Sequence, residues 1–256
     1  MFSWSNPPCR PFIVAHRGSS ALAPENTIAS FSQAISDGAH AVELDVQLTR
    51  DRKLVVFHDT TLSRTSDGRG RLREKTFAQL RALSAGGWFH ESFHMEKIPA
   101  LDEVLELANG RIGVNIEVKG GKNVTDDAPV MVREILASLR RHRMKSSILI
   151  SSFQHRYLRY CHYSHPGITI GCLINPLRSI SRTFPPLVRE GLASYLVLDG
   201  ASCGRNLVRR AHNANLLVGE YTVNSTRRLR RALRNEVDAI YTDSPGEIVE
   251  YLRKNG

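Results

Sequence analysis

Cysteine is scarce in this chain: four occur in 256 residues, and none forms a Cys-x-x-Cys pair. That scarcity excludes a disulfide-rich secreted domain and a thiolate zinc site. We expect Cys9, Cys161, Cys172 and Cys203 to be free, buried thiols in a reducing compartment.

Long apolar runs are also missing. No stretch approaches the roughly 18 residues that a membrane-spanning helix needs, so we expect no stable membrane insertion. The start, Met1 to Cys9, lacks the basic and apolar regions of a secretory signal, which predicts a cytoplasmic location. Nothing resembles an interdomain linker, so we expect residues 1–256 to form a single domain.

Acidic residues are outnumbered, and the formal net charge is +10. Basic residues cluster at 140–143 and 227–231, within helical patterns whose apolar side is marked by leucines such as Leu139 and Leu229. No aromatic residues interleave with these arginines to stack on bases. We therefore expect solvated outer faces and no nucleic-acid partner, although a positive field attracts anionic substrates or anionic lipid surfaces.

What the chain does contain is a regular alternation of short apolar runs, rich in β-branched residues, with longer amphipathic runs. The expected strands are 12–16, 41–47, 112–118, 147–152, 168–174, 195–199, 217–223 and 238–242. The expected helices that follow them are 26–37, 126–143, 155–163, 179–190, 205–214, 225–235 and 245–254. About eight such units favour an α/β fold of the closed (β/α)₈ TIM barrel type over an open doubly wound sheet.

One segment departs from this alternation. The runs 43–49 and 54–59 are too close for a parallel crossover, which predicts a β-hairpin after the second strand with its turn near Asp51 and Arg52. This turn would place His58 beside Asp45. A long insertion with helical stretches at 77–83 and 101–108 then precedes the third barrel strand. Trp88 in this insertion either lines a substrate pocket or forms, with Phe89, a local hydrophobic anchor.

Three acidic residues occupy alternating positions in apolar strands. Glu43 and Asp45 are two residues apart and share a strand face, and Glu117 stands in a similar pattern with Lys119. Oxygen ligands without cysteine favour Mg²⁺ or Ca²⁺ over zinc. The alternative is that each carboxylate is paired with an arginine. We expect one divalent cation, since a charged trio on inward strand positions would otherwise repel.

Two histidines end apolar strand runs next to charged residues, in His16-Arg17-Gly18 and His58-Asp59. Cleavage of a phosphate ester needs one proton acceptor and one proton donor, and imidazole serves both roles. Arg17 has a guanidinium fork suited to phosphate, and Lys119 adds a point charge. The other histidines show no comparable partners in sequence; they are His40, His90, His94, His142, His155, His162, His165 and His212.

A series of short motifs runs along almost the whole chain in a specific order: His16-Arg17-Gly18, Pro24-Glu25-Asn26-Thr27, Glu43-Leu44-Asp45-Val46, His58 to Thr65, Ile98 to Leu105, Asn115 to Lys119, Ser151-Ser152-Phe153, Tyr221-Thr222-Val223-Asn224 and Thr242-Asp243-Ser244-Pro245. In these motifs and their order the chain resembles the glycerophosphodiester phosphodiesterase family, in its short cytosolic bacterial type. One departure is Tyr221, where relatives often carry tryptophan; tyrosine keeps an aromatic wall but adds a hydroxyl.

The resemblance implies a TIM barrel that hydrolyses glycerophosphodiesters, such as glycerophosphocholine or glycerophosphoethanolamine, to glycerol 3-phosphate and an alcohol. It makes His16 the proton acceptor and His58 the proton donor. It also implies the remaining site residues: Glu43, Asp45 and Glu117 as metal ligands, Arg17 and Lys119 as phosphate-binding groups, and Glu25 and Tyr221 as supporting residues. The expected partner is a small-molecule substrate, and the oligomeric state, monomer or homodimer, is left open.

The sequence leaves two alternative functions open. A phospholipase D-like lyase on the same barrel would release a cyclic phosphate, although such relatives are secreted and disulfide-bonded. A non-enzymatic basic module that binds nucleic acid or anionic membrane would rest on the arginine clusters alone.

Overall fold

The computed structural model describes residues 2–120, 127–144, 146–174 and 184–255. Within them, eight parallel strands close into the expected TIM barrel, because β1 pairs with both β2 and β9. The barrel strands are β1 (Phe12–His16), β2 (Ala41–Leu48), β4 (Gly113–Val118), β5 (Ile148–Ser152), β6 (Thr169–Ile174), β7 (Tyr195–Asp199), β8 (Leu217–Tyr221) and β9 (Ala239–Thr242).

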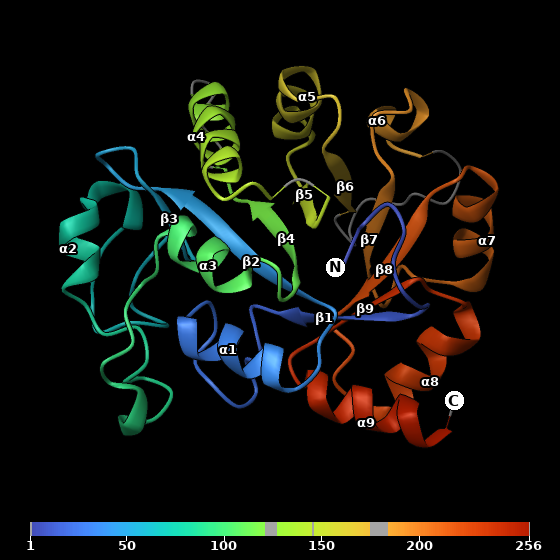
Figure 1. Ribbon diagram of the computed structural model, residues 1–256, viewed down its shortest axis with the longest axis horizontal. Helices are drawn as coiled ribbons and strands as arrows, with labels where there is room; N and C mark the ends of the chain where they lie inside the picture. Colours follow the sequence, from blue (N-terminus) through green and yellow to red (C-terminus); the bar gives the residue numbers. More distant parts are fainter. Residues whose placement is uncertain (1, 121–126, 145, 175–183, 256) are drawn as a thin grey trace.

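Helices surround this barrel, as Figure 1 shows. They are α1 (Ile28–Ser36), α3 (Leu101–Ala108), α4 (Asp127–Arg141), α5 (His155–Ser164), α6 (Pro186–Arg189), α7 (Arg205–Asn213), α8 (Thr226–Asn235) and α9 (Pro245–Asn255). In the described part of the chain, no helix combines the length and apolar character needed to cross a membrane.

Helix ends differ from expectation where local chemistry decides them. The first helix begins at Ile28 because the Thr27 hydroxyl caps it and accepts from the Ser30 amide at 3.3 Å. For the helix expected at 179–190, residues 179–183 lie outside the described residues. The described remainder, α6, begins only at Pro186, because Pro185 precedes a proline and is kept out of the helical region.

The barrel has two apolar layers. Residues such as Val14, Leu149 and Val197 point inward and fill the barrel, whereas Val42 and Ile116 point outward and pack under the helices. The period-2 alternation of each strand therefore supplies both layers. The same alternation brings polar residues to inward positions at the carboxyl ends of the strands.

The segment before β1 closes the base of the barrel. Trp4 is fully buried, its Nε1 donates to the Ser147 carbonyl at 2.9 Å, and the Tyr195 hydroxyl donates to its carbonyl at 2.6 Å. Its ring packs edge-on against Phe12 and Tyr195. This aromatic plug fills one end of the barrel, and the cavity described below lies at the other end, where the strands carry polar residues.

The hairpin forms as predicted. Strand β3 (Leu54–Val56) runs antiparallel to β2, and the Phe57 amide donates to the Asp45 carbonyl at 2.8 Å. The next residue, His58, is thereby placed beside the acidic end of β2. Beyond it the insertion holds α2 (Phe77–Arg81) and two short 3₁₀ turns, Leu72–Glu74 and Glu91–Phe93, around its own small core. This insertion lies to one side of the barrel in Figure 1.

One surface expectation needs correction: three cysteines are buried free thiols, but Cys9 is exposed. The arginines of the two basic clusters are exposed as expected, with one exception. Arg231 is half-buried and pairs with the fully buried Glu220 at 2.5 Å.

Candidate active site

Strand register assembles the polar residues in rows. His16 on β1 is the register partner of Glu43 on β2, and Glu43 is in turn the partner of Asn115 on β4. One row further along, Asp45 is the partner of Glu117. Because parallel strands place equivalent positions side by side, residues distant in sequence meet at one end of the barrel.

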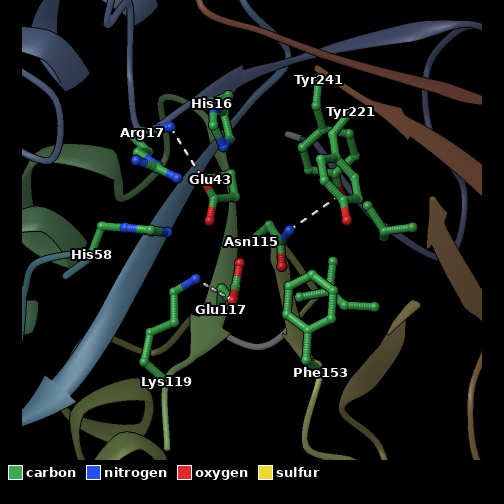
Figure 2. Close-up of a pocket in the computed structure, with 12 residues that line it drawn as sticks. His16, Arg17, Glu43, His58, Asn115, Glu117, Lys119, Phe153, Tyr221 and Tyr241 are labelled. Carbon is green, nitrogen blue, oxygen red and sulfur yellow. Dashed lines mark hydrogen bonds and ion pairs between the residues drawn. The ribbon is translucent and has the colours of Figure 1, made fainter. Parts of the chain in front are cut away.

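All of these residues except Asp45 line a cavity of about 200 Å³. It is lined by His16, Arg17, Glu43, His58, Asn115, Glu117, Lys119, Phe153, Leu173, Val197, Tyr221 and Tyr241. In Figure 2, Arg17, His58 and Lys119 lie on one side, and Phe153 and Tyr221 lie on the other, with Glu43 and Glu117 between them. Of the expected site residues, Asp45 and Glu25 do not line the cavity but contact Arg17, which does.

The acidic trio is buried and electrostatically unequal. Burial and repulsion from Asp45 and Glu117 raise the pKa of Glu43 well above its usual range. Burial also raises the pKa of Glu117. Burial acts in the same direction on Asp45, but the nearby Lys119 and Arg17 outweigh it and lower the pKa of that carboxyl. Asp45 is thus ionised. The positive charge near Glu43 and Glu117 does not offset the effect of burial on these two carboxyls.

The cations present only partly neutralise these acids. Lys119 Nζ lies 3.0 Å from Asp45 Oδ1 and also contacts Glu117. Arg17 Nε lies 3.4 Å from Asp45 Oδ2, but its Nη1 also binds Glu25 at 2.8 Å. The alternative that each acid pairs with its own arginine is therefore wrong for Glu43 and Glu117 within the described residues.

The trio fits a divalent cation. Ligand oxygens of Glu43, Asp45 and Glu117 lie within 4.8 Å of one another. Glu43 Oε1 is buried and finds no hydrogen-bond partner among the described residues. An all-oxygen set with an unsatisfied buried carboxylate atom is the donor chemistry that Mg²⁺ and Ca²⁺ use. The geometry therefore suggests a divalent ion without specifying which one.

Both histidines are oriented by carboxylates. His16 Nδ1 lies 2.7 Å from Asp243 Oδ1, and His58 Nδ1 lies 2.6 Å from Asp59 Oδ1. Burial alone would raise the pKa of Asp243, but its hydrogen bond with His16 lowers it, so the carboxylate accepts and the imidazole donates. The Nε2 atom of each ring is then the nitrogen left for the cavity that both side chains line.

Sequence reasoning missed both carboxylates as site residues. Asp59 directly follows His58, and Asp243 directly follows the last barrel strand. A polar residue just past the carboxyl end of a barrel strand is a recognisable signal for a site residue. For Asp243 this signal becomes informative only once His16 is known to lie opposite it.

A tight turn after β1 completes the polar side. Arg17 and Gly18 both have positive φ angles, 58° and 83°, and the Arg17 amide donates to Glu43 Oε2 at 3.0 Å. A Cβ at position 18 would lie 2.6 Å from the backbone of Ser30, so only glycine fits. Nearby, Asn26 Nδ2 donates to Asp45 Oδ2 at 2.8 Å and orients that carboxylate.

The other side of the cavity is aromatic. The rings of Phe153 and Tyr221 meet edge-on with centroids 6.5 Å apart. Burial, with the charges of Asp199 and Glu117, raises the pKa of Tyr221 to about 12, so its hydroxyl stays neutral. Tyr221 therefore occupies the aromatic wall expected from the resemblance.

Residues of the insertion and the remaining histidines show where else the expectations hold or fail. Trp88 forms an edge-on pair with Phe89 and donates from Nε1 to the Ala85 carbonyl at 2.9 Å, and neither ring is among the described residues that line the cavity. The pocket interpretation is therefore wrong for this cavity, and the anchor interpretation stays a prediction, because Trp88 is 42% exposed. The expectation for the other histidines is wrong in two cases, because His142 pairs with Asp102 at 3.0 Å and His212 with Asp238 at 2.8 Å.

Comparison with known proteins agrees with this geometry. Residues 16–247 match the glycerophosphoryl diester phosphodiesterase family. A glycerophosphodiester phosphodiesterase of Caldanaerobacter subterraneus subsp. tengcongensis is 34% identical over 96% of this chain and 100% of its own length. A Bacillus subtilis protein of the same name is 32% identical over 93% of this chain and 85% of its own.

Solved structures of phosphodiesterases share this fold. A phosphodiesterase of Oleispira antarctica, solved with the product sn-glycerol-3-phosphate, superimposes with a TM-score of 0.86 at 29% identity, covering 95% of this chain and 97% of that one. The family match spans the barrel and its polar end together. The chain therefore belongs to the glycerophosphoryl diester phosphodiesterase family of hydrolases.

Proposed function

We propose that this protein hydrolyses glycerophosphodiesters, such as glycerophosphocholine and glycerophosphoethanolamine, to glycerol 3-phosphate and an alcohol, and that it does so with one divalent cation. The observation that carries this proposal is the pair of carboxylate-oriented imidazoles, His16 and His58, in one cavity with the acidic trio. Acid, base and anion-binding groups are thereby available to a single phosphodiester.

In this proposal the two imidazoles divide the proton transfers. His16 takes the proton of the attacking hydroxyl through Nε2, and its Nδ1–H remains bonded to Asp243. His58 gives a proton to the departing alkoxide oxygen, with Asp59 bonded to its Nδ1. The two carboxylates hold the rings in place through Nδ1, so that each Nε2 stays directed at the substrate.

Phosphate binding is assigned to Arg17 and Lys119. Both line the cavity and lie on the same side of it as His58 (Figure 2). A guanidinium fork and an ammonium together match the oxygens of a phosphodiester. A divalent cation held by Glu43, Asp45 and Glu117 would add charge neutralisation and polarisation of the phosphoryl group.

Three further expectations remain predictions. They are a single domain over residues 1–256, a monomer or homodimer, and a cytoplasmic location. The choice between Mg²⁺ and Ca²⁺ is likewise open to experiment, because carboxylate oxygens bind both ions.

Purified protein should be incubated with glycerophosphocholine in the presence of Mg²⁺, Ca²⁺ or Mn²⁺, each with a chelator control, and followed by phosphorus NMR. We expect metal-dependent release of glycerol 3-phosphate. A cyclic phosphate that persists would instead identify the lyase. No turnover, together with tight DNA binding that falls steeply with salt, would identify the basic binding module.

Variants test the residue roles. His16→Ala and His58→Ala should each lower kcat/KM by about 10²- to 10⁴-fold, the usual contribution of a general acid or base. His142→Ala is the matched control, because it also removes a histidine paired with an aspartate, but one that is not among the residues lining the cavity. Wild-type turnover by either cavity variant would refute its assignment.

A further inference from the structure

A single arginine outside the cavity bridges two carboxylates. Arg64 lies in the insertion after β3, and its guanidinium donates in three directions. Nε reaches Asp59 Oδ2 at 2.5 Å, while Nη1 and Nη2 reach the two oxygens of Glu25 at 2.7 Å each. This fork therefore ties the insertion to the loop between β1 and α1.

Each bridged carboxylate leads to a side chain of the cavity. The other oxygen of Asp59 binds His58 Nδ1 at 2.6 Å. Glu25 Oε1 binds Arg17 Nη1 at 2.8 Å. His58 and Arg17 lie on the same side of the cavity in Figure 2, so two separate paths run from Arg64 to that side.

We propose that Arg64 is a positioning residue that sets His58 for leaving-group protonation through Asp59 and sets Arg17 for phosphate binding through Glu25. This inference rests on the proposed function. No direct contact with substrate is required, because the guanidinium acts through two carboxylates that it already binds.

Charge and exposure agree with this role. The single positive charge of Arg64 lies against two carboxylates, so both Asp59 and Glu25 are held by a charged partner outside the cavity. The side chain of Glu25 is 13% exposed and that of Asp59 is 24% exposed, so water competes weakly for the carboxylates. Lysine cannot reproduce this arrangement, because the three bonds leave from three separate nitrogens of a planar guanidinium, whereas an ammonium has a single nitrogen.

The two paths predict separable kinetic effects. Protonation by His58 matters for glycerophosphocholine, whose alcohol is a poor leaving group, and hardly for a glycerophosphodiester of p-nitrophenol, which departs as a stable anion. Phosphate binding by Arg17 matters for both substrates. Arg64→Ala should therefore lower kcat for glycerophosphocholine by about 10- to 100-fold, spare kcat for the p-nitrophenyl ester, and raise KM for both.

Two further variants separate the paths. Asp59→Asn should reproduce only the loss of kcat with glycerophosphocholine, and Glu25→Gln only the rise in KM. Arg64→Lys should restore kcat and KM only partly towards their wild-type values. Arg159→Ala is the matched control, because Arg159 also binds both oxygens of a glutamate, Glu190, at 2.5 and 2.7 Å, and has a similar exposed fraction. It should leave both substrates unaffected.

The inference is overturned if Arg64→Ala behaves like Arg159→Ala. It is also overturned if kcat falls equally for both substrates together with a lower melting temperature, since that pattern marks a structural role. Combining Arg64→Ala with Asp59→Asn should lower kcat no further than either change alone, and full additivity would equally contradict it. Failure of the wild-type protein to cleave either ester would refute the proposed function first, and so the two failures are distinguishable.

Discussion

His16 and Asp243 are joined by a 2.7 Å hydrogen bond although they lie 227 positions apart in the sequence. His16 ends the first barrel strand, and Asp243 follows the last one. These two strands pair when the barrel closes, with Ala15 opposite Thr242. Closure of the barrel therefore also orients the imidazole, which links folding to the geometry of the site.

Asp243→Asn should consequently lower kcat/KM for glycerophosphocholine by about 10- to 100-fold, as is typical when an orienting partner is lost. The amide can donate to the ring as well as accept from it, so the orientation of the His16 proton is no longer set. Steady-state kinetics measure the loss. Asp102→Asn, which alters the aspartate paired with His142, should leave the kinetics unchanged. Retention of more than half the activity by Asp243→Asn would contradict the role.

The acidic trio should make stability depend on metal. Mg²⁺ or Ca²⁺ at about 100 times its dissociation constant should stabilise the folded protein by about 2.7 kcal/mol, because the ion binds the folded state preferentially. Glu43→Gln should abolish this gain, yet in chelator it should be no less stable than wild type, since it removes a carboxylate that is disfavoured by burial and repulsion. Thermal unfolding of both proteins, with metal and with chelator, tests the loss of metal stabilisation and the unreduced stability of the metal-free variant. An undiminished metal effect in the variant would exclude Glu43 as a ligand.

Buried thiols should make the fold sensitive to alkali. Burial raises the pKa of Cys161 from 9.0 to about 12. Above pH 9 the unfolded chain loses this proton while the folded protein keeps it, so stability falls as pH rises from about 9 towards 12. Between pH 9 and 10 the loss from this one thiol is about 1 kcal/mol. Between pH 9 and 10 the free energy of unfolding, measured in urea, should fall by about 1 kcal/mol less in Cys161→Ala than in the wild type. An identical pH dependence of the two proteins would contradict the raised pKa of Cys161.

The two tryptophans provide a matched test of the barrel plug. Trp4→Ala should reduce the free energy of unfolding by about 3–5 kcal/mol, because it leaves a cavity among packed rings and removes a buried hydrogen bond. Trp88→Ala should cost less than about 1 kcal/mol, since Trp88 is 42% exposed. Urea denaturation compares them. Equal losses would mean that the N-terminal segment does not stabilise the barrel base.

Much of the fold follows from local patterns. Period-2 apolar runs predict the strands, and the eight-fold alternation with helices predicts the barrel, because only parallel β–α units bury both sheet faces. The hairpin was also predictable, since the residues between Leu48 and Leu54 are too few for a crossover. The first residue of a helix is harder to predict, as the helices that follow Thr27 and begin at Pro186 show, because capping and proline chemistry act over single residues.

For the site, the sequence by itself determined the residue types and their strand faces: Glu43 with Asp45, Glu117 two residues before Lys119, and a histidine at the end of two apolar runs. Strand alternation is a local property, so it can be read without the fold. Only the tertiary structure decided the partners. Asp243 on His16 and the Arg64 bridge between Asp59 and Glu25 arise from barrel closure and loop packing, which bring together groups that no sequence spacing relates.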